Sequence, residues 1–175
     1  MSFIQTLSCK HFNYLDIQQD AIEIEDIATA LSHICRFAGH LPEFYCVGQH
    51  SVLSSLLVPQ EFALEALLHD AAEAYLQDIP APLKHLLPDY RAMETRVDAA
   101  IRQKFGLPTE QHPTVKYADL VMLASERRDF EIDDGTVWPM LEGIIPTDQF
   151  VINPVRPGQA YGMFMNRFHQ LMERR

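Results

Sequence analysis

Four ionisable residues stand inside apolar stretches of this sequence, where such side chains need partners. They are His50 in GQHSVLSSLL, His69 and Asp70 in LLHDAAEAYLQD, and Asp119 in VKYADLVMLAS. Burying a polar or charged group costs free energy unless a hydrogen bond, an opposite charge or a metal ion compensates it. Two imidazoles and two carboxylates suit a first-row divalent ion and leave coordination positions for water and substrate. The four residues therefore predict a metal site.

Each of these residues also has an ordinary structural interpretation. His50 could cap a helix, and His69 could be a buried histidine beside a capping or salt-bridged aspartate. Asp119 could pair with Lys116 or Arg127. The combination favours a metal, because three separate helices each present an ionisable group on an apolar stretch.

Glu73 adds a candidate for proton transfer. It lies three and four residues after Asp70 and His69, so on a continuous helix it shares their face. Its apolar neighbours would raise the pKa of its carboxyl group. A carboxyl group with a raised pKa is suited to general acid–base catalysis at neutral pH.

The spacing His … His-Asp … Asp resembles the HD-domain metal-dependent phosphohydrolase superfamily. Three longer segments, CRFAGHLPEFYCVGQHS, ALLHDAAEAYLQDIPAPLK and VKYADLVMLASERRD, resemble one branch of it. That branch holds small bacterial and phage enzymes similar to 5′-deoxynucleotidases. The resemblance covers residues 1–130 and, more loosely, the remainder. It implies an HD-domain helical bundle.

The resemblance also implies roles for individual residues. Glu73 matches the catalytic carboxylate of the family, and Asp78 matches a second acidic residue of the pocket. Arg36 matches an arginine that contacts substrate phosphate, although by itself it would suit a helix C-terminus. Lys84 matches the lysine of a D-x-P-x-P-x-K stretch, here DIPAPLK, although alone it would be a solvated lysine. The implied metal ligands are His50, His69, Asp70 and Asp119.

The implied cofactor is one divalent transition-metal ion, drawn from Mn, Co, Fe, Ni and Zn, and a second Mg²⁺ or Mn²⁺ could accompany the substrate. Such an ion lowers the pKa of a bound water toward about 7 and neutralises phosphoryl oxygens. Phosphoryl transfer depends mainly on positioning and charge stabilisation. The resemblance implies that the activity is hydrolysis of (deoxy)nucleoside 5′-monophosphates to nucleoside and phosphate.

Two alternatives stay open, a deoxynucleoside triphosphate triphosphohydrolase and a non-catalytic nucleotide sensor. The motifs place few cations near the site in a chain whose net charge is −10, which favours one phosphate over three. Glu73 argues against a pure sensor, because binding alone needs no activated water.

The elements that position these residues are expected to be helices. Apolar residues recur at three- and four-residue steps, and the pattern predicts helices over residues 23–40, 47–58, 59–77, 88–106, 113–130 and 158–175. Gly39 and Gly106 are expected helix ends. The glycines and prolines of residues 131–157 predict irregular structure. Residues 2–16 show a weak alternation of apolar and polar side chains and contain aromatic and β-branched residues, which predicts a short hairpin or an extended arm. The expected fold is all-α, with a short N-terminal β hairpin or arm, in one domain over 1–175.

The net charge, the apolar runs and the cysteine content restrict the kinds of partner that we expect. A net charge of −10 disfavours a general nucleic-acid binder. No apolar run reaches the ~18 residues of a membrane span, and the first residues do not resemble a secretory signal. The cysteines are odd in number and without zinc-site spacing, so they predict reduced thiols. We expect a cytoplasmic enzyme with a small-molecule nucleotide substrate and no membrane partner, and the resemblance implies a homo-oligomer.

Overall fold

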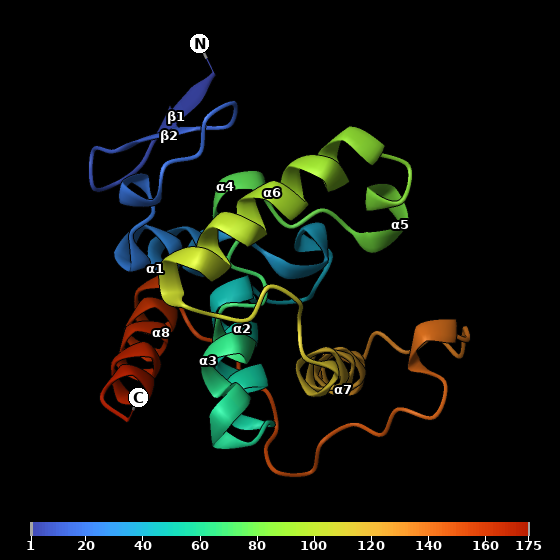
Figure 1. Ribbon diagram of the computed structural model, residues 1–175. Helices are drawn as coiled ribbons and strands as arrows, with labels where there is room; N and C mark the ends of the chain where they lie inside the picture. Colours follow the sequence, from blue (N-terminus) through green and yellow to red (C-terminus); the bar gives the residue numbers. More distant parts are fainter. Residues whose placement is uncertain (1, 175) are drawn as a thin grey trace.

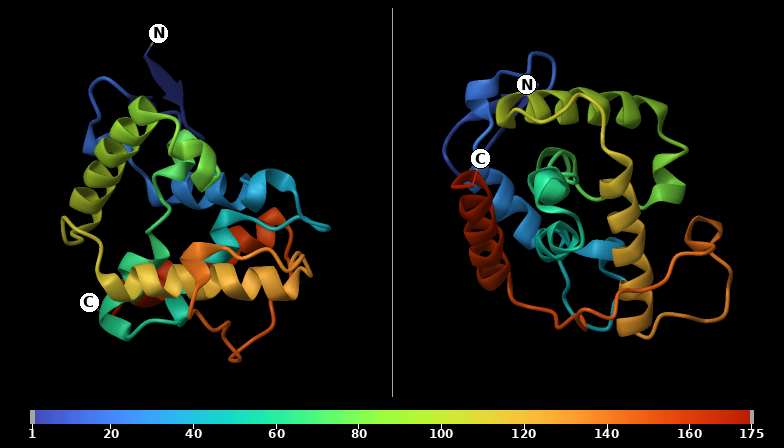
Figure 2. Two further views of the ribbon diagram at one scale, coloured as in Figure 1. Left: turned by 90° about the vertical axis from the view of Figure 1, so that its right-hand side faces the viewer. Right: turned by 60° about the horizontal axis from the view of Figure 1, so that its bottom comes forward.

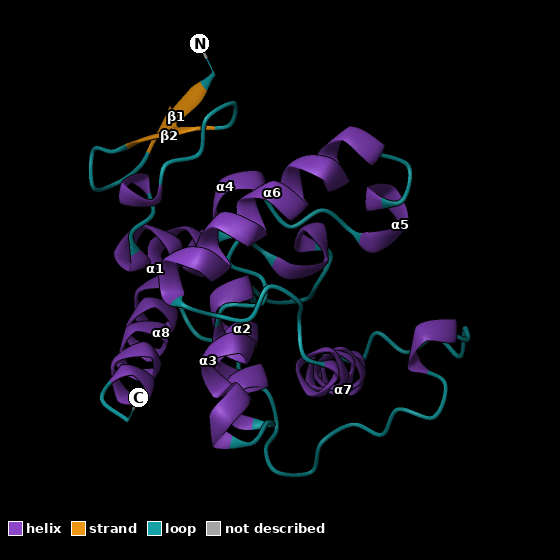
Figure 3. Ribbon diagram, in the orientation of Figure 1, coloured by secondary structure: helices purple, strands orange, loops and turns teal. Residues whose placement is uncertain are grey.

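The computed structural model describes residues 2–174, and most of them are helical (Figures 1 and 3). This confirms the expected all-α fold with a short N-terminal hairpin. Met1 and Arg175, the ends of the expected domain, lie outside the described residues. In the described part of the chain, no helix is both long and apolar enough to cross a membrane. The α-helices are α1 (Ile24–His33), α2 (Val47–Leu56), α3 (Ala63–Leu67), α4 (Glu73–Leu76), α5 (Ala81–Lys84), α6 (Pro88–Phe105), α7 (Pro113–Asp129) and α8 (Pro157–Met172).

Helix α2 lies at the centre of the molecule. It contacts α1, α3, α7 and α8, and Figure 2 shows α2 and α3 surrounded by the other long helices. Its ten residues include no Asp, Glu, Lys or Arg, which suits burial on all sides. Gly48 permits close approach to α1, since a Cβ at this position would lie 3.2 Å from the backbone nitrogen of Ser32. The central helix thereby carries His50 into the interior.

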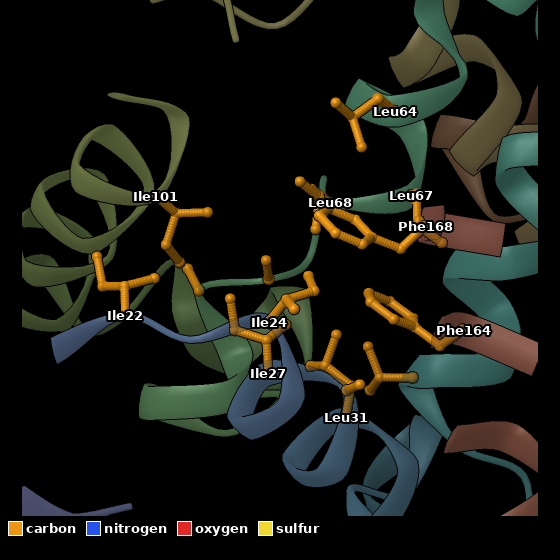
Figure 4. Close-up of a cluster of buried hydrophobic side chains, with 14 of the residues drawn as sticks. Ile22, Ile24, Ile27, Leu31, Leu64, Leu67, Leu68, Ile101, Phe164 and Phe168 are labelled. Atoms are coloured by element: carbon orange, nitrogen blue, oxygen red, sulfur yellow. The ribbon is translucent and has the colours of Figure 1, made fainter. Parts of the chain in front are cut away.

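The main hydrophobic core joins α1, α3, α6 and α8 (Figure 4). Ile27, Leu31, Leu67, Ile101 and Phe164 are all completely buried there. A smaller cluster attaches the irregular segment after α7 to that helix, and it consists of Tyr45, Met122, Phe130 and Ile152.

The ends of α6 and α7 follow the signals in the sequence. Pro88 and Pro113 each stand in a first helical turn, where a missing N–H costs nothing. Gly106 ends α6 in the left-handed conformation with φ of 62°. Helices α2, α6, α7 and α8 confirm the predictions over residues 47–58, 88–106, 113–130 and 158–175. Residues 131–156 are irregular apart from a 3₁₀ turn at Pro139–Leu141, and Pro157, the last residue of the stretch predicted as irregular, begins α8.

The N-terminal hairpin is attached to α4. Strand β1 (Phe3–Gln5) pairs antiparallel with β2 (His11–Asn13), and Ile4 lies opposite Phe12. Phe12 is completely buried and stacks on Tyr75 at 3.9 Å between ring centroids. The Tyr14 hydroxyl donates to the carbonyl oxygen of Tyr75 at 2.6 Å.

The first helix is shorter than predicted. It ends at His33 rather than Gly39, because the next residues are extended and pair with the segment before α2. The amide of Arg36 donates to Tyr45 at 2.9 Å, and the amide of Val47 donates to Ile34 at 3.1 Å. A 3₁₀ turn, η2 (Arg36–Gly39), follows with left-handed backbone at two non-glycine residues, Phe37 and Ala38. Arg36 therefore stands in a turn and not at a helix C-terminus.

The helix predicted over 59–77 is broken, and this correction concerns the site directly. Between α3 and α4 the chain makes tight turns, with Ala71 donating to Leu68 at 3.0 Å and Glu73 to Asp70 at 3.0 Å. The His69 ring donates from Nδ1 to the Ala66 carbonyl at 2.7 Å and competes there with the helical backbone. His69 and Asp70 therefore lie in a turn. The short helix α5, between Pro80 and His85, was not predicted.

The assigned hydrophobic core predicts how single substitutions change the free energy of unfolding. Replacing Ile27 by Ala removes buried methyl groups that the closely packed surroundings cannot replace, so we expect a loss of about 2–5 kcal/mol in the free energy of unfolding. Ile145→Ala is the matched control, because Ile145 is 76% exposed and should change stability by roughly 0.5 kcal/mol at most. Chemical denaturation followed by circular dichroism measures both. Equal losses in the two variants would contradict the assigned core.

Candidate metal centre

Nitrogen and oxygen atoms from α2, the α3–α4 turn and α7 converge on one point. The Nε2 atoms of His50 and His69 are 3.3 Å apart. Asp119 Oδ1 lies 3.3 Å from the first and 3.7 Å from the second. Donor atoms bound at about 2.0–2.2 Å to one ion stand roughly 3–3.5 Å from their neighbours. These three residues thus have metal-ligand spacing, and all their donor atoms lie within 4.8 Å of one another.

Asp70 completes the predicted set from the same turn as His69. Its Oδ2 atom lies 3.2 Å from Nε2 of His69 and 3.7 Å from Nε2 of His50. The structure therefore brings together the four residues predicted as ligands, although a turn and not a helix presents two of them.

The two histidines direct their Nε2 atoms to the centre. His50 donates from Nδ1 to Glu126 Oε1 at 2.6 Å, and His69 donates from Nδ1 to the Ala66 carbonyl at 2.7 Å. A carbonyl oxygen and an ionised carboxylate only accept hydrogen bonds, so both Nδ1 atoms carry the hydrogen. This arrangement of a metal-facing nitrogen and an anchored second nitrogen is typical of metal-ligating histidines.

The electrostatics of this cluster fit a cation. Burial lowers the pKa of His69, but the carboxylates of Asp70 and Asp119 outweigh burial and hold that pKa well above its ordinary value. Burial raises the pKa of Asp119, but hydrogen bonding with His50 and His69 holds it well below its usual range. The carboxylates thus draw positive charge to the point that they share with the imidazoles. A divalent ion would supply that charge in place of protons, because metal ligation requires neutral histidines.

The ordinary pairing proposed for Asp119 is also present. Lys116 Nζ donates to Asp119 Oδ2 at 2.8 Å, while Arg127 pairs with Asp133 at 2.6 Å. The lysine occupies one carboxylate oxygen of Asp119 and leaves the other facing the histidines. The pairing with Lys116 is therefore compatible with the predicted ligand role of Asp119.

Glu126 is a site residue that the sequence analysis missed. Its side chain is completely buried, and it accepts hydrogen bonds from His50 at 2.6 Å and from Arg36 at 2.8 Å. Burial raises its pKa, but the positive charges of Arg36 and His50 outweigh burial and lower it, so the carboxylate is ionised. A signal was available, since Glu126 lies seven residues after Asp119, two turns along the same helix face.

Arg36 lies beside the predicted ligands. Its Nη1 atom is 3.7 Å from Asp70 Oδ2, and its Nε atom is buried without a hydrogen-bond partner in the described structure. Burial lowers the pKa of Arg36, but the carboxylates of Glu126 and Asp70 hold it well above its usual value. The guanidinium is therefore charged and retains a free donor.

A cavity of about 250 Å³ opens next to the cluster. Glu73 lines it and is 6% exposed, and its Oε2 atom is buried without a partner in the described residues. Burial, together with the carboxylates of Asp70 and Asp78, raises the pKa of Glu73 well above its usual value. The remaining lining residues are polar except for one alanine, and they are His69, Asp70, Ala72, Lys84, Glu94, Thr95, Asp98, Arg102 and Gln111.

The other two predicted pocket residues, Asp78 and Lys84, lie close to this cavity. Lys84 Nζ donates to Glu94 at 2.6 Å and stands 3.9 Å from Glu73 Oε1. Burial raises the pKa of Asp78, and the charges of Arg36 and Asp70 also act on it. The three cysteines are free and contribute nothing to the cluster.

Fold and site together define a helical protein with a buried cluster of histidines and aspartates beside a polar cavity. No family model matches the chain. It is 64% identical over 175 residues to an Escherichia coli K12 protein described as uncharacterized protein YfdR, covering 100% of this chain and 98% of that protein. An uncharacterized protein of Rhodobacter capsulatus is 34% identical over 122 residues, 64% of this chain and 62% of its own length. The chain belongs to the YfdR family.

The cluster predicts metal binding. We expect the metal-free chain to bind about one Mn²⁺ or Co²⁺ and to gain about 2.7 kcal/mol of stability when the free ion reaches roughly 100 times its Kd. His69→Ala should abolish both effects, because it removes a donor atom. His33→Ala is the matched control, since His33 is exposed and its ring donates a hydrogen bond to the carbonyl oxygen of Thr29 on its own helix. Metal analysis after dialysis and thermal denaturation measure the outcome, and retention of the ion by His69→Ala would contradict the assignment.

Proposed function

We propose that this protein is a metal-dependent phosphohydrolase of the HD-domain type that converts deoxynucleoside 5′-monophosphates to nucleoside and orthophosphate. One observation carries the proposal, namely the convergence of two Nε2 atoms and two carboxylate oxygens beside a polar cavity. The helices around that point are compatible with an HD-domain bundle, and the bundle is part of the proposal.

The ion would be a divalent transition metal, from Mn to Zn, held by His50, His69, Asp70 and Asp119. When bound, it would supply a water of lowered pKa and charge stabilisation for phosphoryl oxygens. A second Mg²⁺ or Mn²⁺ could arrive with the substrate, and the remaining work falls to the side chains around the cavity.

Glu73 is the proposed proton-transfer residue. Its raised pKa keeps the carboxyl group protonated to higher pH than an exposed glutamate, so it can donate a proton to the leaving 5′-oxygen of the nucleoside. The unpartnered Oε2 atom leaves one side of the group free for substrate or water. Asp78, whose pKa is raised in the same surroundings, is proposed to assist it.

Arg36 and Lys84 are the proposed phosphate-binding cations. The free Nε donor of Arg36 is suited to a charge-assisted hydrogen bond with a phosphate oxygen. Lys84 is held at the cavity by Glu94 and offers a point charge. Lys84 lines the cavity, and Arg36 stands 3.7 Å from Asp70, which also lines it. The cavity volume of about 250 Å³ is just below the usual range of roughly 300–1,000 Å³ and favours a monophosphate over a triphosphate.

Product analysis tests the proposed reaction. The full chain loaded with Mn²⁺ or Co²⁺ should release orthophosphate from dAMP, and exhaustive chelation should abolish turnover until the metal is restored. Separate incubation with dAMP and dATP identifies the bond that is cut. Tripolyphosphate from dATP with dAMP intact would instead establish a triphosphohydrolase. Binding of both nucleotides without any product would establish a sensor.

Glu73→Gln tests the assigned proton transfer. The amide keeps the size of the side chain but cannot donate a carboxyl proton, so kcat should fall by about 10²–10⁴-fold while bound metal stays at the wild-type level. Glu25→Gln makes the same chemical change at an exposed position of α1 and should leave kcat unchanged. Steady-state kinetics and metal content are measured together. Loss of the metal in Glu73→Gln would show that Glu73 is a ligand.

A further inference from the structure

One buried carboxylate connects the candidate metal centre to the predicted phosphate-binding arginine. Glu126 Oε1 accepts from the Nδ1 atom of His50, a predicted metal ligand, at 2.6 Å. Glu126 Oε2 accepts from Nη2 of Arg36, the predicted phosphate-binding cation, at 2.8 Å. The side chains of Glu126 and His50 are completely buried, and that of Arg36 is 11% exposed.

We propose that Glu126 is a positioning residue that orients His50 for the metal ion with one oxygen and Arg36 for the substrate phosphate with the other. The inference rests on the proposed function. It adds that one side chain on α7 sets the geometry of both metal binding and phosphate binding.

The helix that carries Glu126 explains how one residue can do this. Asp119, a predicted ligand, lies on α7 two turns before Glu126, so the same rigid element provides a ligand and the support for the ligand from α2. The hydrogen bond at Nδ1 fixes the ring orientation of His50 and increases the basicity of Nε2. The carboxylate also restricts rotation of the Arg36 guanidinium, which is carried by the 3₁₀ turn η2.

Charge balance supports the same role. Arg36 is a cation whose Nη1 atom is 3.7 Å from the predicted ligand Asp70, so it would repel a bound metal ion. The negatively charged carboxylate of Glu126 contacts both Arg36 and His50, and its charge offsets that repulsion. With a divalent ion in place, the charges of Asp70, Asp119 and Glu126 balance those of the ion and Arg36.

Glu126→Gln breaks the shared arrangement, because an amide has one acceptor oxygen where the carboxylate has two and so cannot accept from both His50 and Arg36. The amide NH₂ group only donates, so it cannot accept from either His50 or Arg36. We expect Glu126→Gln to raise the Kd for Co²⁺ by about 10–100-fold and to change the visible absorption of the bound Co²⁺, because the ligation by His50 is altered. We also expect a higher KM for dAMP.

Two further variants identify the cause. Arg36→Gln leaves the contact between Glu126 and His50 intact, so it should raise KM while the Co²⁺ spectrum stays as in the wild type and the Kd does not increase. Glu65→Gln is the matched control for burial, since Glu65 is 3% exposed and pairs with Arg102 at 3.1 Å outside the cluster. It should leave the Kd for Co²⁺ unchanged. Isothermal titration of the metal-free full chain and absorption spectra give these values independently of activity.

The double variant Arg36→Gln/Glu126→Gln covers the case in which Glu126→Gln leaves a buried arginine unpaired and does not fold. The Kd of the double variant for Co²⁺ should equal that of Glu126→Gln, and its KM for dAMP should equal that of Arg36→Gln. Both equalities are expected because the two substitutions remove the same contact between Glu126 and Arg36. Wild-type Kd and spectrum in either Glu126 variant would overturn the inference while leaving the proposed function in place. Additive effects on KM would overturn the assigned action on Arg36. A wild-type chain that binds no metal would overturn both proposals.

Discussion

The rest of the structure depends on holding two imidazole nitrogens and two carboxylates at one buried point. Neighbouring nitrogen and oxygen atoms of this cluster lie 3.2–3.7 Å apart, and at these distances they repel unless a proton or a metal ion stands between them. Central α2, the α3–α4 turn and α7 each supply part of the set. The hydrophobic core must fix these three segments against one another, because a shift of about 1 Å would spoil the common point.

The backbone departs from regular helix where it serves this cluster. Phe37 and Ala38 adopt left-handed φ values of 54° and 51°, which cost roughly 1–2 kcal/mol per residue and bring Arg36 to the site. The α3–α4 turn interrupts a stretch rich in alanine and leucine to present His69 and Asp70. Local preference and final structure disagree here, and such disagreements are expected at functional sites.

Hydrogen bonds around the cluster are as informative as the cluster itself. The Ala66 carbonyl and Glu126 fix the rings of His69 and His50, and both acceptors come from elements that also carry or adjoin predicted ligands. Arg36 is the link from this network to the cavity, where Glu73 and Lys84 lie. The geometry therefore joins a candidate metal centre to a candidate substrate site through paired charges, in a chain whose overall charge is acidic.

The sequence by itself determined the helical class, the N-terminal hairpin and the helices α2, α6, α7 and α8, because periodicity, proline at helix starts and glycine at helix ends act locally. It also determined which residue types need partners, and so singled out His50, His69, Asp70 and Asp119. Only the structure decided where α1 ends, because the residues after it pair with the segment before α2. It also decided where the 59–77 helix breaks, because tight turns and the bond from the His69 ring to the Ala66 carbonyl outweigh helix propensity there. The spacing of Glu126 from Asp119 was visible in the sequence, but its role was decided only by the tertiary structure, because the partners of its buried carboxylate lie 76 and 90 residues away.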